Sequence, residues 1–213
     1  MEQTQPPQIK HVAIAGNIGA GKTTLCTQLG KHFNWDVHYE STENNPYLSD
    51  FYLDMRRWSF NLQIYFLNNR YQQILKILQG DTTVVQDRTI YEDAYIFAPN
   101  LHDMGLMSTR DFQNYFDLFK TMSSQIQPPD LLIYLRANIP TLVAHIQARG
   151  REYEGNMSLD YLKRLNERYE AWIETYDEGR LLIINADDID FIQKPEDLGN
   201  VINMVSAELH GLF

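Results

Sequence analysis

A glycine-rich segment near the start of the chain has the residue types and spacing of a phosphate-binding loop. Residues 16–23 fit the pattern G-x-x-x-x-G-K-[ST] completely. The glycines let backbone N–H groups surround phosphate oxygens, and the helix that follows adds partial positive charge. Lys22 would reach the β- and γ-phosphates of a nucleotide, and the Thr23 hydroxyl would bind Mg²⁺. The candidate ATP-binding residues of this segment are Gly16, Asn17, Ile18, Gly19, Ala20, Gly21, Lys22, Thr23 and Thr24.

Further charged residues follow two predicted strands, where the strands of an open α/β sheet line a crevice. Glu40 follows the strand expected at 35–39, and Asp87 and Arg88 follow the one at 83–86. Attack by a hydroxyl on a γ-phosphate needs a group that accepts or orients the proton, and cations that offset phosphoryl charge. Glu40 suits the first task and Arg88 the second. Thr23, Asp87 and Glu40 are the candidate magnesium residues, with Asp87 acting through water. Each alone could instead be a solvated strand end.

Two arginines open a polar segment at 149–157, ahead of a helix capped by Ser158. Arg149 and Arg151 could close over ATP as a lid, because the guanidinium group meets phosphate oxygens in a bidentate manner. Closure would also exclude water that competes with the substrate hydroxyl. A charged, solvated loop is the alternative.

A long apolar helix at 58–79 carries two polar side chains on one face. Gln63 and Arg70 are seven residues apart, about 10 Å along the helix. A buried arginine needs a partner, and Asp93 is the candidate. Asp93 and Phe97 share a face at i,i+4 spacing. This set could stack on and hydrogen-bond a nucleobase, but a structural salt bridge in the core explains the spacing equally well.

The remaining elements predict an α/β fold. Short apolar strands separated by helices are typical of a parallel sheet that is covered on both faces. We expect one domain over 9–213 and a disordered N-terminus at 1–8. Strands are expected at 11–15, 35–39, 83–86, 131–135 and 181–184. Helices are expected at 22–33, 58–79, through Asp93 and Phe97 to a break near Pro99, 108–126, 140–148, 158–176 and 197–209.

Composition limits the compartment and the partners. The chain has 213 residues, a net charge of −10 and a single cysteine, so an internal disulfide is excluded. Residues 1–8 lack the apolar region of a signal peptide, and no apolar run approaches the roughly 18 residues of a membrane helix. We therefore expect a cytoplasmic protein without a membrane partner. The acidity disfavours long nucleic acid but permits a small anionic ligand held by local cations.

The phosphate-binding loop alone leaves several protein classes open. A regulatory GTPase would need N-K-x-D and D-x-x-G motifs, and the chain has neither. Phosphotransferases and other ATPases remain. A nucleoside monophosphate kinase is disfavoured because Glu40 would repel the phosphate of its acceptor. A non-catalytic ATP-binding module would bind nucleotide without turnover.

Taken together, these motifs resemble the deoxyribonucleoside kinase family, meaning the deoxycytidine, deoxyguanosine and deoxyadenosine kinases. The resemblance extends from about residue 10 to residue 210. Besides the phosphate-binding loop, the motifs that carry it are Glu40, Asn45-Pro46-Tyr47, Tyr52, the run from Arg57 to Gln63, Arg70, Asp87-Arg88-Thr89, Asp93, the run from Tyr95 to Ala98, Arg149-Gly150-Arg151 and Glu154.

The resemblance implies a P-loop NTPase-like three-layer fold, with a five-stranded parallel sheet in the order 2-3-1-4-5 and an arginine-bearing lid. It implies transfer of the ATP γ-phosphoryl group to the 5′-hydroxyl of a deoxynucleoside, with Mg²⁺, in nucleotide salvage. Glu40 would be the base, with Arg88 and Lys22 assisting catalysis. The other implied contacts are Tyr52 and Glu154 with the 3′-hydroxyl, Gln63, Phe66, Arg70, Asp93 and Phe97 with the nucleobase, Arg149 and Arg151 with phosphates, and Asp190 and Phe191 with the ATP adenine.

Three further expectations concern the preferred substrate, a departure from the family pattern and the oligomeric state. The stretch 43–52 looks most like bacterial deoxyadenosine kinases, so deoxyadenosine is favoured, with deoxycytidine and deoxyguanosine as alternatives. His145 stands where many members have an arginine, which puts one phosphate contact in doubt. The apolar surface of the 58–79 helix exceeds what one sheet can cover, and the family resemblance agrees with a homodimer packed helix against helix.

Overall fold

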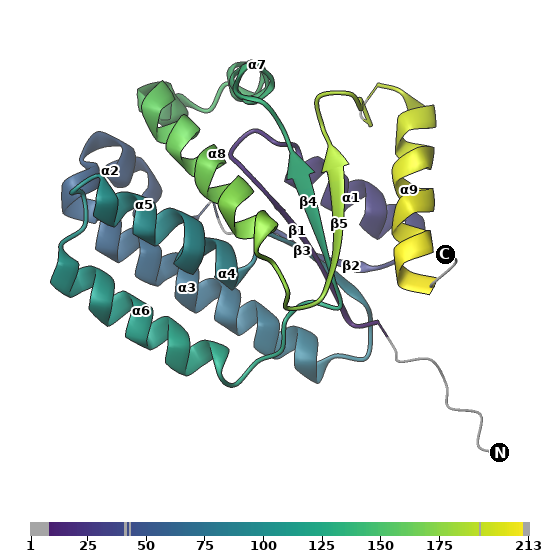
Figure 1. The fold of residues 1–213 in the computed structure, drawn as a ribbon, viewed down its shortest axis with the longest axis horizontal. Helices are drawn as coiled ribbons and strands as arrows, with labels where there is room; N and C mark the ends of the chain where they lie inside the picture. Colours follow the sequence, from purple (N-terminus) through teal and green to yellow (C-terminus); the bar gives the residue numbers. More distant parts are fainter. Residues whose placement is uncertain (1–8, 41, 43, 192, 211–213) are drawn as a thin grey trace.

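Five parallel strands form the centre of the protein (Figure 1). The computed structural model describes residues 9–40, 42, 44–191 and 193–210, and the N-terminus expected to be disordered, 1–8, lies outside them. Within the described residues the sheet has the order β2-β3-β1-β4-β5, so the predicted α/β topology is confirmed. The strands are β1 (His11–Gly16), β2 (Asp36–His38), β3 (Val84–Asp87), β4 (Leu131–Arg136) and β5 (Arg180–Asn185).

Helices cover both faces of this sheet and give three layers (Figure 1). One face carries α1 (Lys22–Phe33) and α9 (Pro195–His210). The other carries α3 (Met55–Gln79), α4 (Ile90–Glu92), the π-helical turn Asp93–Phe97, α5 (Ala98–Asp103), α6 (Thr109–Ser123) and α8 (Leu159–Glu174). The other described elements are α2 (Leu48–Leu53), α7 (Ile139–Arg149) and the 3₁₀ turn Glu152–Asn156.

The central strands are buried on both faces, which explains why they are apolar without alternation. In β1, Val12 and Ile14 pack toward α1 and α9, whereas Ala13 and Ala15 pack toward the α3 and α8 layer. All four side chains are fully buried. The small alanines leave room for the larger helical layer on that face.

The strand register brings three chain segments together at the carboxyl ends of the strands. In β1, Ile14 lies beside Asp87 of β3 and Gly16 lies beside Leu135 of β4. In β2, His38 lies beside Gln86. The segments that follow β1, β2 and β3 therefore emerge next to one another, as open parallel sheets require of a binding crevice.

Several predicted element boundaries are wrong. The break near Pro99 is absent, because the π-helical turn Asp93–Phe97 continues directly into α5, and Pro99 lies at the start of α5. The prediction contained no helix at α2 and no π-helical turn. The strand β2 has three residues rather than five. The segment 149–157 contains a 3₁₀ turn within what was expected to be a loop.

None of the helices in the described part of the chain is long and apolar enough to cross a membrane.

Candidate active site

The phosphate-binding loop joins the end of β1 to the start of α1. Gly19 and Gly21 have φ values of 87° and 97°, a left-handed region that favours glycine. The Lys22 ammonium group donates a hydrogen bond to the backbone oxygen of Asn17 at 3.0 Å. Burial lowers the pKa of Lys22 to about 8, with a further contribution from the Arg88 cation. Lys22 is thus mostly charged at pH 7 and lies inside the loop where phosphates would bind.

The end of β3 places a carboxylate against this loop. The Thr23 hydroxyl donates to Asp87 Oδ2 at 2.5 Å. The second oxygen, Oδ1, is buried and has no hydrogen-bond partner within the described residues. Burial raises the pKa of Asp87, while Lys22 and the Thr23 hydrogen bond oppose the shift. An orphaned carboxylate oxygen next to a threonine hydroxyl suits Mg²⁺, which prefers oxygen ligands and keeps several waters.

A cluster of three or more histidine, cysteine or acidic side chains fit to hold a metal is absent from the described part of the chain. Magnesium in nucleotide sites is bound by one or two protein groups together with phosphates and waters. Thr23 and Asp87 therefore fit this ion only together with a nucleotide.

Arg88 directly follows β3 in an unusual backbone conformation. Its φ is 74°, a region that residues other than glycine rarely adopt and that occurs at functional sites. Its guanidinium group is buried, donates through Nε to Glu40 Oε1 at 3.0 Å, and lies 4.6 Å above the ring of Phe97. The turn thus aims a permanent cation toward the segment that follows β2.

Glu40 receives two guanidinium groups on the same oxygen. Arg70 Nη2 donates to Oε1 at 2.6 Å and Arg88 Nε at 3.0 Å. Burial alone would raise the pKa of Glu40, but Arg88 and Arg70 outweigh it and lower the pKa to about 2. Glu40 is therefore ionised at neutral pH, and its side chain remains 22% exposed toward the cavity. An ionised carboxylate in this position can accept a hydrogen bond from a substrate hydroxyl.

The predicted ion pair between Arg70 and Asp93 is confirmed, with Nη1 and Oδ2 2.7 Å apart. Burial raises the pKa of Asp93 to about 7, against the opposing effect of Arg70. Gln63, also on α3, has a buried Oε1 with no hydrogen-bond partner in the described part of the chain. Arg70 also lies 4.7 Å from the centre of the Phe66 ring. The sequence did not indicate that Arg70 would bind Glu40 as well.

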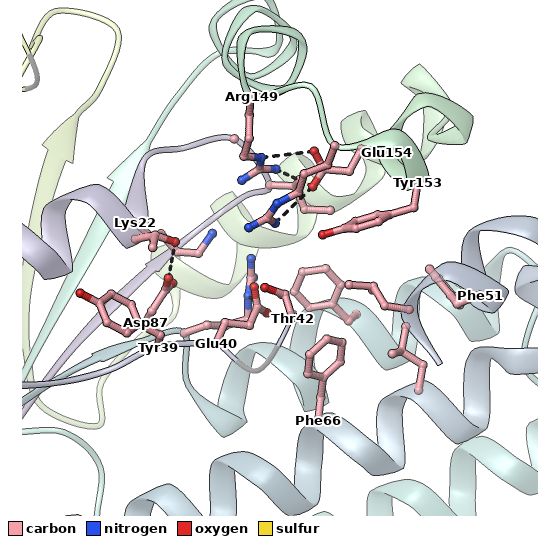
Figure 2. A pocket seen from close by; sticks show the side chains of 18 of the residues that line it. Lys22, Tyr39, Glu40, Thr42, Phe51, Phe66, Asp87, Arg149, Tyr153 and Glu154 are labelled. Atoms are coloured by element: carbon pink, nitrogen blue, oxygen red, sulfur yellow. Dashed lines mark hydrogen bonds and ion pairs between the residues drawn. The ribbon is translucent and has the colours of Figure 1, made fainter. Parts of the chain in front are cut away.

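One cavity of about 770 Å³ connects these groups (Figure 2). Figure 2 shows Glu40 and Asp87 on one side of it and Arg149 and Glu154 on the opposite side. Of the residues predicted as sites, those that line it are Ile18, Gly19, Gly21, Lys22, Thr23, Thr24, Glu40, Tyr52, Gln63, Phe66, Asp87, Arg88, Asp93, Phe97, Arg149, Arg151 and Glu154.

The other predicted site residues do not line this cavity. Gly16, Asn17 and Ala20 are buried in or next to the loop, and Arg70 is 3% exposed behind Glu40 and Asp93. Asp190 and Phe191 lie outside the cavity lining as well. A Cβ added at Gly21 would be 3.0 Å from the Phe191 ring, so Phe191 packs against the phosphate loop.

Both predicted lid arginines bind Glu154. Glu154 receives Arg149 Nη2 at 2.6 Å and Arg151 Nη1 at 3.5 Å. Tyr153, beside Glu154, stacks on Tyr52 with ring centres 5.6 Å apart. The segment 149–157 therefore connects the proposed ATP contacts to the proposed sugar contacts.

Sequence reasoning missed several residues of the site. Tyr39, Thr27 and Tyr153 line the cavity but belong to no motif. Glu92 is a fully buried carboxylate next to Arg88, and Thr89 and Glu92 form a capping box. The spacing T-x-x-E that signals such a box was present in the sequence and could have identified Glu92.

This arrangement defines a P-loop phosphotransferase: a phosphate-binding loop at the carboxyl edge of a parallel sheet faces a carboxylate, an arginine and a pocket. The family model described as deoxynucleoside kinase matches residues 12–210. The chain belongs to the deoxynucleoside kinase family.

Its relatives carry several substrate names. The chain is 35% identical to the deoxyadenosine/deoxycytidine kinase of Bacillus subtilis, covering 99% of this chain and 98% of that one. It is 40% identical to the deoxyadenosine kinase of Dictyostelium discoideum (90% and 77%) and 37% identical to a deoxyguanosine kinase of Lactobacillus johnsonii (93% and 92%). Deoxyadenosine kinase of M. mycoides, solved with dCMP and dCDP, superimposes with a TM-score of 0.83 at 26% identity, covering 92% of this chain and 99% of that one.

Proposed function

We propose that this protein transfers the γ-phosphoryl group of ATP to the 5′-hydroxyl of a deoxynucleoside, with deoxyadenosine as the preferred acceptor. The observation that carries the proposal is the single cavity in which the phosphate loop, the ionised Glu40 and the buried Gln63 and Asp93 meet. A sugar placed in this cavity between the phosphate-binding loop and the end lined by Gln63 and Asp93 would bring its 5′-oxygen between Glu40 and the γ-phosphate.

In this reaction Glu40 accepts a hydrogen bond from the 5′-hydroxyl and takes its proton as the phosphoryl group transfers. Arg88 and Lys22 offset the charge on the phosphoryl oxygens. Arg149 and Arg151 would turn from Glu154 toward phosphate when ATP binds, and Tyr52 and Glu154 would hold the 3′-hydroxyl. Mg²⁺ held near Thr23 and Asp87, with Glu40 nearby, would supply further charge neutralisation.

Deoxyadenosine is supported by the unpaired acceptor in the base pocket. Gln63 Oε1 is buried without a donor in the described residues, and a buried acceptor without a partner is costly. The amino group of adenine or cytosine supplies that donor, whereas guanine has a carbonyl oxygen at the corresponding position. Three of the four relatives named above carry deoxyadenosine in their names, one of them together with deoxycytidine, so deoxycytidine is the second candidate.

The decisive experiment replaces Glu40 by glutamine. The variant keeps the size of the side chain but loses the base, so kcat should fall by roughly 10²- to 10⁴-fold while ATP still binds. Wild-type turnover in this variant would contradict the proposal, and ATP binding without turnover in both proteins would identify a non-catalytic module. Competition among four deoxynucleosides and assay of deoxyadenosine monophosphate would then establish the acceptor.

We also propose that the protein is a cytoplasmic homodimer. In support, α3 has half-buried Phe60, Ile64 and Tyr71 and an exposed Leu78, and the neighbouring α6 exposes Leu118. Apolar side chains on two adjacent helices suit packing against a second copy. Sedimentation at micromolar concentration should give twice the mass of 25.0 kDa.

A further inference from the structure

Glu92 is a completely buried carboxylate outside the cavity lining, with 0% of its surface exposed. It follows Arg88 by one helical turn, in the short helix α4. Burial of an ionised carboxylate is costly unless several donors surround it. Glu92 satisfies this condition through donors from three separate parts of the chain.

One oxygen of Glu92 holds three donors. Oε1 accepts from the backbone N–H of Gly16 at 3.3 Å, from the Tyr169 hydroxyl at 2.7 Å and from Arg88 Nη1 at 3.2 Å. Gly16 begins the phosphate-binding loop, and Tyr169 lies on α8. The carboxylate thus links the ATP side of the site, the proposed catalytic arginine and a core helix.

The other oxygen fixes the turn that carries Arg88. Oε2 accepts from the backbone N–H of Thr89 at 2.7 Å, and the Thr89 hydroxyl accepts from the N–H of Glu92 at 3.3 Å. This reciprocal pair holds the chain immediately after Arg88, whose backbone is left-handed. The Tyr169 hydroxyl also accepts from Arg88 Nη1. The Arg88 guanidinium group therefore lies between Glu40, which lines the cavity, and the fully buried Glu92 and Tyr169.

We propose that Glu92 is a positioning residue that fixes Arg88 relative to the first residue of the phosphate-binding loop. The inference rests on the phosphoryl transfer proposed above, because it assigns Glu92 an effect on that reaction through Arg88. Only a carboxylate suits the position. It offers an acceptor at both oxygens, whereas an amide would direct an NH₂ group at one of the four donors.

The test compares Glu92→Gln with wild type. Because Glu92 does not line the cavity, the Kd for deoxyadenosine should stay within about twofold of wild type. The kcat, expressed per deoxyadenosine binding site counted by calorimetry, should fall about 10- to 100-fold, the effect of losing one hydrogen bond to a charged group. A purely structural role would reduce the number of binding sites and leave kcat per site unchanged, which would overturn the proposal.

The effect should also depend on Arg88. In an Arg88→Met background, Glu92→Gln should cause no further fall in kcat, because groups that act through one another are not additive. A further fall of the same size would overturn the proposal.

If the Glu92→Gln variant does not bind deoxyadenosine, Tyr169→Phe is used as the test variant in its place. It keeps the carboxylate but removes one donor and one acceptor, and should lower kcat about 2- to 10-fold. Unchanged kcat in that case would overturn the proposal. Absence of turnover in the wild-type protein would overturn the proposed function as well. The wild-type assay therefore distinguishes a failure of the proposed function from a failure of the Glu92 proposal.

Discussion

Replacing Asp93 by asparagine should change how the stability of the protein depends on pH. Asp93 is 1% exposed, and burial raises its pKa from 3.8 to about 7 despite the Arg70 cation. In the folded protein Asp93 therefore keeps its proton over a pH range where the unfolded chain has already released it. The stabilisation that this provides is complete below about pH 4 and is lost as the pH rises through about 7.

The size of this effect follows from the shift. Between pH 5 and about pH 7 each pH unit removes about 1.4 kcal/mol, so from pH 5 to pH 8 the loss is about 3 kcal/mol. Asparagine cannot titrate and has a similar shape. Arg70 also keeps a partner in the variant, because Glu40 lies 2.6 Å from it.

The assay is urea denaturation of wild type and Asp93→Asn at pH 5, 6, 7 and 8. Wild type should lose about 3 kcal/mol of unfolding free energy relative to the variant over this range. Asp117→Asn is the matched control for exchanging a carboxylate for an amide, since the Asp117 side chain is 77% exposed. A constant difference between wild type and Asp93→Asn would refute the reasoning.

Two further variants test the two ends of the cavity. In Gly21→Ala, the φ of 97° and the Phe191 ring 3.0 Å from the new Cβ introduce roughly 1–2 kcal/mol of strain, so the Kd for a fluorescent ATP analogue should rise about tenfold while deoxyadenosine binding is retained. Unchanged nucleotide affinity would contradict the geometry of the loop. In Glu154→Gln, the preference for deoxyadenosine over 2′,3′-dideoxyadenosine, expected to be about tenfold in wild type, should approach one. An undiminished preference would exclude Glu154 as the partner of the 3′-hydroxyl.

Local patterns in the sequence were sufficient to predict the phosphate loop and the sheet. The loop depends on glycines and on a strand followed by a helix, and these features lie within a dozen residues of one another. Apolar strands alternating with helices predicted the parallel sheet, and β1 to β5 appear where expected with small shifts at their ends. Strand order came from the family resemblance, since periodicity does not define which strands are neighbours.

The tertiary structure alone decided how the charges pair. Arg70 was expected to bind Asp93, but it also binds Glu40, because the ends of β2 and β3 bring Glu40 within reach of α3. Arg149 binds Glu154, a partner that sequence reasoning did not assign to it. Such contacts join residues that are distant in the chain or depend on the shape of a loop, so no local spacing encodes them.

The sequence by itself determined which residues could do phosphoryl-transfer chemistry, because residue type and local spacing set the loop, the strands and the capping signals. Only the folded chain decided their protonation and their partners. Both depend on burial and on charges brought together by the sheet, as Glu40, with a pKa lowered to about 2, and Asp93, with one raised to about 7, demonstrate in the same cavity.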